Sequence, residues 1–182
     1  MTDKPIHFYK FLVNNQVFYK SKHTYALVNL KPLVPGHVLV VPYRTSVLRF
    51  GDLNPEESLD YMNTLQFVHK FIIHNYKADA LNIAIQDGPE SGQSIPHLHT
   101  HLIPRYKADG YGDDIYTKVE KMDLQQLYRE FESRKDAFQK HTASGAPKEL
   151  AVLDEHREVR TEKVMHEEAI WLADEIEKFS KI

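Results

Sequence analysis

The sequence predicts an α+β fold in which an antiparallel sheet carries one long helix. Short segments rich in Val, Tyr, Phe and Leu occupy the chain up to residue 42, a strongly periodic helical segment follows, and strand character resumes near residue 81. Strands followed by a helix and then by more strands favour α+β over a doubly wound parallel sheet. The 182 residues are enough for one globular domain with its own core.

The first strands are expected at residues 16–20, 24–30 and 37–42. Lys22-His23 separates the first two, and Pro32 with Pro35-Gly36 separates the second from the third. Apolar segments between such turn signals are typical of strands, and their close succession predicts an antiparallel meander.

A long helix is predicted from residue 55. Asn54 is a good N-cap, Pro55 suits the first helical position, and Glu57 can return a hydrogen bond to the cap. Apolar side chains then recur every three or four residues over about 22 residues, which predicts one face packed on the sheet. These side chains are Met62, Leu65, Val68, Ile72 and Tyr76.

Strand character returns after the helix. Residues 81–86 form an apolar segment that ends at Asp87-Gly88-Pro89, a typical turn, and residues 96–103 (PHLHTHLI) alternate again. We expect both segments to be strands of the same sheet and the domain core to span residues 1–122.

Two further helices are expected after this core. Asp123 and Gln126 have the spacing of a capping box, which predicts a helix over residues 123–140. Residues 141–157 are expected to be a loop or linker, and residues 158–182 an amphipathic helix that packs on the same domain or on a second subunit. The apolar faces consist of Leu124, Leu127, Phe131 and Phe138 in the first helix and of Met165, Ala169, Leu172, Ile176 and Phe179 in the second.

Composition excludes several classes of protein. A formal net charge of -3 supplies no overall positive field for DNA or RNA, so neither is an expected partner. The absence of cysteine excludes a disulfide framework, a thiolate nucleophile and a cysteine-based metal site. Apolar runs fall far short of the ~20 residues that cross a bilayer, and the N-terminus lacks a secretory pattern, so neither membrane binding nor secretion is expected.

His97, His99 and His101 are the strongest chemical signal in the sequence. They alternate along a predicted strand, and strand side chains alternate between two faces, so all three rings are expected on one face. The chain has 11 histidines in 182 residues, and a strand that buries a face would normally use Val or Ile there. This concentration indicates a functional site.

A metal site is one interpretation, because His-x-His on a strand is a common pair of zinc ligands. In an extended strand, however, the Cα atoms of His97 and His101 would lie ~13 Å apart, too far to share one tetrahedral ion easily. Asp87 and Glu90 lie in the preceding turn, and no nearby carboxylate repeats the pattern. Metal is therefore the secondary interpretation, and no protein-bound metal is expected.

The other interpretation is nucleophilic catalysis on phosphorus. A neutral imidazole can attack phosphorus, form a phosphoramidate and be displaced by water, provided that its neighbours fix its tautomer and bind the phosphate oxygens. A central histidine between two others meets this need. The preceding loop, residues 86–96, contains Gly88, Gly92, Gln93 and Ser94, whose donors can hold an anion without a formal positive charge.

With these motifs the sequence resembles the histidine-triad (HIT) superfamily. Residues 97–103 match its pattern His-φ-His-φ-His-φ-φ, where φ is apolar, except that Thr100 stands at the second φ. The resemblance spans residues 8–121 and is greatest to fungal members of the Fhit branch, the dinucleoside polyphosphate hydrolases. The segments that carry it are YALVNLKP (25–32), VPGHVLVVP (34–42), QDGPE (86–90) with Gly92-Gln93, and IPR (103–105). Phosphoramidases normally end the triad in Gly-Gly and nucleotidyl transferases replace its third His by Gln, so both sister branches fit less well.

The resemblance implies a HIT-like fold and hydrolysis of diadenosine triphosphate to AMP and ADP through a nucleotidyl-histidine intermediate. In that case His99 would be the nucleophile, His101 would contact phosphate oxygens, His97 would hold the ring orientation and His37 would pack behind the triad. The remaining implied contacts are Asn29 at the ribose, Gln86, Gly92, Gln93, Ser94 and Ile95 at the phosphates, and Leu27, Leu39 and Phe8 at the adenine.

Several of these residues also have a structural interpretation. Leu27 and Leu39 would be core residues in any fold, and Asn29 in an apolar strand needs a partner that is either a ligand or a turn. His37 is as well explained by a satisfied buried histidine, and Gln86 and Gln93 by bracing of the loop.

The resemblance further implies a homodimer in the cytoplasm, and also in the nucleus. Divalent Mg or Mn would neutralise the substrate polyphosphate rather than occupy a protein site. Two alternative functions stay open: a hydrolase of nucleoside phosphoramidates or adenylated conjugates from another HIT branch, and a nucleotide-responsive signalling protein that uses the same pocket.

Overall fold

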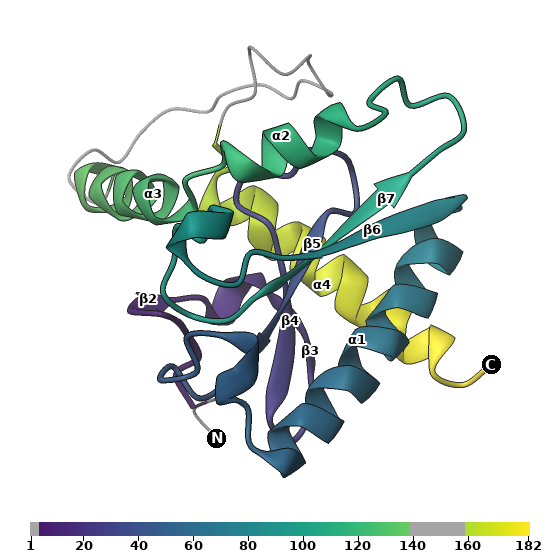
Figure 1. The fold of residues 1–182 in the computed structure, drawn as a ribbon, viewed down its shortest axis with the longest axis horizontal. Coiled ribbons are helices and arrows are strands. Elements are labelled where there is room, and N and C mark those ends of the chain that lie inside the picture. Colours follow the sequence, from purple (N-terminus) through teal and green to yellow (C-terminus); the bar gives the residue numbers. More distant parts are fainter. Residues whose placement is uncertain (1–3, 139–158) are drawn as a thin grey trace.

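The computed structural model describes residues 4–138 and 159–182, which form an α+β domain around a five-stranded sheet (Figure 1). The sheet order is β3-β4-β5-β7-β6, and every neighbouring pair is antiparallel. Its strands are β3 (Val17–Lys20), β4 (Thr24–Val28), β5 (Val38–Pro42), β6 (Ala80–Ile85) and β7 (Thr100–Arg105). The predicted α+β class and the antiparallel meander of the first three strands are therefore confirmed.

A short hairpin and several helices surround the sheet. The hairpin consists of β1 (His7–Phe8) and β2 (Phe11–Leu12), and the helices are α1 (Pro55–Tyr76), α2 (Asp114–Glu120), α3 (Leu124–Phe138) and α4 (Glu162–Phe179), with 3-10 turns η1 (Asn14–Gln16), η2 (Phe50–Asp52) and η3 (Pro89–Ser91). The sequence pattern predicts neither the hairpin nor α2, because two-residue strands and a seven-residue helix are too short to show a hydrophobic period.

The long helix α1 begins as predicted but buries a slightly different face. The Asn54 side chain accepts a hydrogen bond from the Glu57 N–H at 2.9 Å, and the Glu57 carboxylate accepts one from the Asn54 N–H at 3.0 Å. Met62, expected on the buried face, is 42% exposed, whereas Tyr61 is 1% exposed. Tyr61 faces the sheet because its hydroxyl finds hydrogen-bond partners there, so the polar tip does not oppose its burial.

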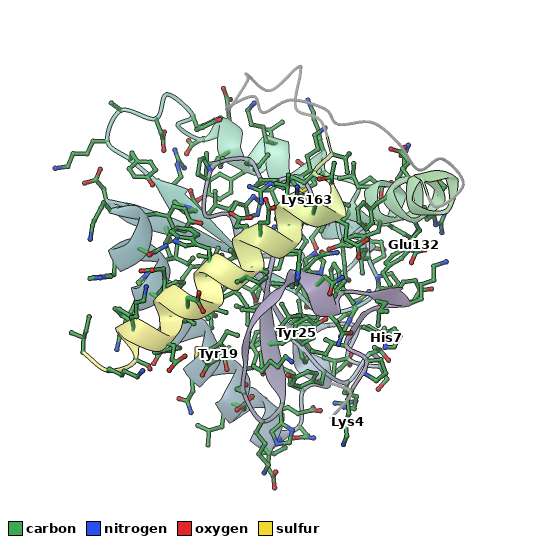
Figure 2. All side chains as sticks on the ribbon, turned by 180° about the vertical axis from the view of Figure 1, so that it is seen from behind. Lys4, His7, Tyr19, Tyr25, Glu132 and Lys163 are labelled. Atoms are coloured by element: carbon green, nitrogen blue, oxygen red, sulfur yellow. The ribbon has the colours of Figure 1, made fainter. Side chains whose placement is uncertain are left out.

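Helices α1 and α4 lie side by side on one face of the sheet. α1 packs on β4, β5 and β7, and α4 packs on β3 and β4 (Figures 1 and 2). The predicted apolar stripe of α4 is buried at Met165, Ala169, Leu172 and Ile176. Phe179, the last member, contacts aromatic rings of α1, so α4 packs on its own domain. No helix in residues 4–138 or 159–182 is long and apolar enough to span a membrane.

The start of α3 differs from a full capping box. The Asp123 carboxylate accepts a hydrogen bond from the Gln126 N–H at 2.9 Å, as expected, but the Gln126 side chain donates to Glu130 instead of returning to the cap. Leu124 is buried, and Leu127 and Phe131 pack against the core. The Phe138 side chain and the loop or linker expected at residues 141–157 lie outside what the structure describes.

The strand that carries the histidines begins later than predicted. Residues 96–103 were expected as one strand, but β7 starts at Thr100, so only His101 of the three histidines is within it. The preceding segment turns because the His97 N–H bonds to the Ile95 carbonyl at 2.8 Å, and the Leu98 N–H bonds to the Val47 carbonyl at 2.8 Å. Thr100 is the first residue of this segment that pairs with the neighbouring strands. The expectation of one strand over residues 96–103 is therefore wrong, but the rings stay together, because the Phe8 ring contacts both His97 and His99, and the ring centroids of His99 and His101 lie 5.2 Å apart.

Candidate active site

The sheet register places several expected site residues on one face. Leu27 pairs with Leu39, and Leu39 pairs with His101. Directly opposed residues of antiparallel strands point to the same face, so these three side chains share it. Thr100 points to the other face, where its hydroxyl lies 2.7 Å from the Tyr61 hydroxyl of α1. The candidate site therefore lies on the face opposite α1.

The β1–β2 hairpin covers this face. Tyr25, two residues before Leu27 on β4, donates from its hydroxyl to the His7 carbonyl at 3.0 Å, and Figure 2 labels both residues. The ring of Phe8 lies edge to face against His99, with 5.3 Å between centroids, and 5.8 Å from the His97 ring. Phe8 is fully buried, so it closes the site as well as lining it.

His97 uses both ring nitrogens for contacts inside the protein. Its Nδ1 accepts from the Tyr9 N–H at 2.9 Å, so the ring proton is on Nε2, which donates to the Pro42 carbonyl at 3.0 Å. Tyr9 adopts the left-handed region (φ 59°), which is strained for a tyrosine and which aims its N–H at the ring. Burial, with a smaller effect from His99, lowers the pKa of His97 to about 4. The ring is therefore neutral and fixed in one tautomer.

His99 has one free ring nitrogen. Its Nδ1 lies 2.8 Å from the backbone carbonyl of His97, which can only accept, so Nδ1 carries the proton and Nε2 carries the lone pair. His99 Nε2 is buried and has no hydrogen-bond partner among the described residues. Burial lowers the pKa of His99, which keeps this lone pair unprotonated. An imidazole in this state is suited to attack phosphorus.

His101 presents the opposite group. The Leu33 N–H donates to His37 Nδ1 at 3.1 Å, so His37 carries its proton on Nε2, which lies 2.9 Å from His101 Nδ1. His101 Nδ1 must then accept, which leaves the His101 proton on Nε2. Burial, with the positive charges that His37 and His99 would carry, holds the pKa of His101 well below its usual value. His101 is thus a neutral N–H donor whose Nε2 is also buried without a partner among the residues described.

Together these contacts set an unpaired lone pair on His99 beside an unpaired N–H on His101. The two rings lie 5.2 Å apart between centroids. Unpartnered buried polar atoms are costly and uncommon in native structures, so two neighbouring ones indicate a place for a polar ligand. His99 Nε2 can attack an electrophilic atom of the ligand, while His101 Nε2–H donates a hydrogen bond to an oxygen bound to that atom.

Asn29 has a protein partner in this structure. Its Oδ1 accepts from the Lys31 N–H at 3.1 Å. Its Nδ2 lies 3.2 Å from His37 Nε2, but both atoms carry protons in the tautomer assigned above, so the two are neighbours without a hydrogen bond between them. These contacts satisfy the turn interpretation and also place Asn29 next to the histidine chain. Leu27 and Leu39 are fully buried, which the core interpretation requires.

Gln86 and Gly92 lie together in the loop before the triad. Gly92 has φ +87°, and a Cβ at this position would lie 2.6 Å from the Gln86 side-chain nitrogen. Glycine therefore permits both the left-handed turn and the close approach of the Gln86 amide. Gln86 is buried and donates to the Val119 carbonyl at 3.5 Å.

The other loop residues have structural contacts away from the imidazoles. Gln93 donates to the Leu48 carbonyl at 2.7 Å, which is the bracing contact that the sequence left open. Ser94 accepts from the Leu124 N–H at 3.0 Å and so ties the loop to the start of α3. Ile95 is fully buried in the core.

The sequence gives no signal for three aromatic residues of the site. Phe11 and Tyr128 pack behind Phe8, and Tyr9 fixes the His97 tautomer through its backbone. Tyr128 comes from α3, so only the tertiary structure brings it to the hairpin. Within residues 4–138 and 159–182, no group of three His, Asp or Glu side chains is arranged to hold a metal ion.

Comparisons with known proteins give a matching family and similar relatives. The family model of the HIT domain matches residues 11–108. Bis(5'-adenosyl)-triphosphatase of Saccharomyces cerevisiae (strain ATCC 204508 / S288c) is 60% identical over 136 residues, which are 75% of this chain and 66% of that protein, slightly under two thirds of its length. Bis(5'-nucleosyl)-tetraphosphatase [asymmetrical] of Schizosaccharomyces pombe is 42% identical over 172 residues, 93% of each chain.

Solved structures show the same fold. Plasmodium falciparum diadenosine triphosphate hydrolase superposes with a TM-score of 0.67 at 23% identity, over 98% of this chain and 88% of that one. The C. elegans NitFhit protein gives a TM-score of 0.64 at 23% identity, over 96% of this chain and 31% of that one.

Proposed function

Because the chain belongs to the HIT family, we propose that it is a dinucleoside polyphosphate hydrolase that cleaves diadenosine triphosphate to AMP and ADP. One observation carries this proposal: the lone pair of His99 Nε2 lies beside the N–H of His101 Nε2, and both atoms are buried without partners in the described part of the chain. A fixed neutral nucleophile next to a fixed donor is what transfer of a nucleotidyl group to nitrogen requires.

The proposed reaction has two displacements. His99 Nε2 attacks the α-phosphorus, the bond from phosphorus to the bridging oxygen breaks, and ADP leaves with the electron pair as a phosphate anion, while His101 Nε2–H donates a hydrogen bond to a phosphate oxygen and keeps its proton. Water then attacks the same phosphorus, the N–P bond breaks, AMP leaves, and the electron pair returns to His99. The spare proton of that water is released to solvent, and His101 keeps its proton throughout. The bond from His99 Nδ1–H to the His97 carbonyl holds the ring in both steps and stabilises its positive charge while it carries the nucleotide.

The substrate contacts follow the family pattern in this proposal. Leu27, Leu39 and Phe8 would contact the adenine, and Asn29 the ribose. Gln86, Gly92, Gln93, Ser94 and Ile95 would lie along the phosphates, with Gln93 and Ser94 exchanging their present protein partners for phosphate oxygens.

A divalent Mg or Mn ion would travel with the substrate. The lowered pKa values of His97, His99 and His101 arise from burial and from other histidines, with no carboxylate among their causes. Mg and Mn prefer carboxylate and phosphate oxygens, so the polyphosphate supplies the better ligands. The ion would neutralise phosphate charge, and the histidines would still perform both displacements.

We also propose that the protein is a homodimer. β6 is an edge strand of the sheet, and Ile83 on it is 48% exposed. An open edge with an exposed apolar side chain favours pairing with a second copy. Sedimentation equilibrium is expected to give twice the 21.2 kDa chain mass, and the Ile83→Glu variant is expected to give the mass of the monomer.

We also propose that the protein is located in the cytoplasm and, as a second compartment, in the nucleus. Imaging of a tagged chain in cells tests this location.

The test of the function compares wild type with His99→Asn on diadenosine triphosphate and Mn, with AMP and ADP separated by chromatography. Equal amounts of AMP and ADP are expected from wild type, and several orders of magnitude less from His99→Asn, because the nucleophile is gone. His166→Asn, on the exposed face of α4, is the control and should match wild type.

The same assay distinguishes the substrates. Two fungal relatives carry the names triphosphatase and asymmetrical tetraphosphatase, and the higher identity belongs to the first, so diadenosine triphosphate is expected to react faster than the tetraphosphate. If the protein cleaved an AMP amide but neither dinucleotide, we would assign it to another branch of the HIT family. Binding of the dinucleotide without turnover would support the signalling alternative.

A further inference from the structure

The nucleophilic nitrogen is covered in this structure. His99 and His101 are each 1% exposed, and their Nε2 atoms are buried. A nucleophile must come within about 3–3.5 Å of the atom that it attacks. Part of the cover therefore has to move before any phosphorus reaches His99.

The cover consists of the hairpin and of one residue of α3. Phe8 lies directly on His99, and the ring of Tyr128 contacts Phe8 edge to face at 5.7 Å. Tyr128 also stacks on Phe11 from β2, with 5.1 Å between centroids and 19° between planes. Tyr128 thus occupies the place between the two hairpin phenylalanines and holds Phe8 over the nucleophile.

Tyr128 is anchored by one polar contact. Its hydroxyl donates to the Gln16 side-chain oxygen at 2.7 Å, and Tyr128 and Gln16 are 1% and 3% exposed. This hydrogen bond joins residues 112 positions apart and connects α3 to the turn that follows the hairpin. Breaking it without a replacement leaves a buried polar group unpaired, so the contact acts as a latch.

The helix has room to move on its other side. Among the described residues, an open groove of about 730 Å³ lies between α3, the segment before β5 and α2. Gln126 and Leu127 of α3 line it, and Lys31 and Leu33 lie across from them. A shift of α3 toward this groove would withdraw Tyr128 from the hairpin and would move Leu127 and Phe131 along the core against which they pack.

We propose that Tyr128 determines access and base affinity: it holds the site closed, and a purine base displaces it from its place on Phe11. This inference rests on the proposed function, because the group that displaces Tyr128 is the base of the proposed nucleotide substrate. A purine can replace the near-parallel stack that Tyr128 makes with Phe11. An exocyclic amino group on the purine can donate to the Gln16 oxygen that Tyr128 releases, so the buried acceptor stays paired.

The first experiment measures AMP affinity and the kinetic constants for diadenosine triphosphate in Tyr128→Phe. This variant keeps the ring but loses the latch, so the closed arrangement is weakened. We expect AMP to bind, and KM to fall, by about fivefold, the equivalent of one hydrogen bond, with kcat unchanged. Arg129→Ala, on the exposed side of α3, is the matched control and should change neither constant.

The second experiment follows hydrogen exchange of the α3 amides with and without saturating AMP in the wild-type chain. Displacement of Tyr128 predicts faster exchange in residues 124–133 when AMP is bound. Because Tyr128→Ala removes a buried ring and can lower stability, the exchange measurement keeps the inference testable without it.

The outcomes separate the two proposals. Hydrolysis by wild type, with a higher or unchanged KM in Tyr128→Phe and slower α3 exchange with AMP, would overturn the role of Tyr128 and leave the proposed function intact. AMP binding with faster α3 exchange, but no hydrolysis, would support the role of Tyr128 and overturn the proposed function. If the wild-type protein neither bound AMP nor hydrolysed the dinucleotide, both proposals would be overturned.

Discussion

Burial of His97 is expected to make the stability of the protein fall steeply between pH 6.5 and pH 4. In the folded protein this ring is fully buried, donates to the Pro42 carbonyl and accepts from the Tyr9 N–H, and its pKa is lowered to about 4. In the unfolded chain the same ring has its ordinary pKa of 6.5. Between these two values the unfolded chain binds a proton that the folded protein does not, so unfolding is favoured as the pH falls.

The size of the effect follows from the two pKa values. Each unit of difference corresponds to about 1.4 kcal/mol, so the full contribution of His97, reached below pH 4, is about 3 kcal/mol. Between pH 7 and pH 5 the free energy of unfolding should fall by about 2 kcal/mol through this ring alone. His99 and His101 also have lowered pKa values and add to the fall in the same direction.

The assay is urea unfolding at pH 7 and pH 5, followed by circular dichroism, for wild type and His97→Gln. Glutamine offers an acceptor and a donor but cannot take up a proton in this range. The loss of stability between the two pH values should be about 2 kcal/mol smaller in His97→Gln than in wild type. An equal loss in both proteins would refute the assignment of a buried, neutral His97.

Three further substitutions test the packing that supports the site. Gly36→Ala should lower the free energy of unfolding by about 2 kcal/mol in thermal unfolding, because Gly36 has φ +81° and a new Cβ would lie 2.8 Å from the Tyr76 ring; Gly51→Ala, with nothing within 4 Å of its Cβ, is the control and should cost less than half as much. Asn54→Ala should cost about 1 kcal/mol in urea unfolding, since it removes the N-cap of α1, and an unchanged midpoint would contradict the cap. Tyr61→Phe should cost about 1–3 kcal/mol, because it leaves polar groups of β5 and β7 unpaired, and wild-type stability would show that the hydroxyl is dispensable.

The elements that local signals specify could be predicted closely. The Asn54 cap, Pro55 at the first helical position and the periodic stripe behind them predict α1, and the stripe from Met165 to Phe179 predicts the buried face of α4. Each of these signals lies within consecutive turns of one helix, so the sequence is sufficient to read it. The exception on α1, where Tyr61 replaces Met62 on the buried face, depends on hydrogen bonds to strands far along the chain.

The histidine motif shows which feature of the site local sequence patterns do not predict. The alternation of residues 96–103 predicts a strand, yet β7 begins only at Thr100, because the Leu98 N–H bonds to Val47 and not to a neighbouring strand. The pattern identifies the residues of the site but starts the strand too early, so His97 and His99 precede β7 instead of lying within it.

By itself, the sequence determined the class of fold, the chemistry of three clustered histidines and the resemblance that names their family. The tertiary structure decided which nitrogen of each ring is free. The Tyr9 N–H reaches His97 across 88 positions and His37 reaches His101 across 64, and Tyr128 closes the site from α3. Backbone N–H and carbonyl groups fix the tautomers of His37, His97 and His99, and nearly every residue type supplies them. No residue pattern can therefore encode these contacts, and only the fold decides where those groups meet a ring.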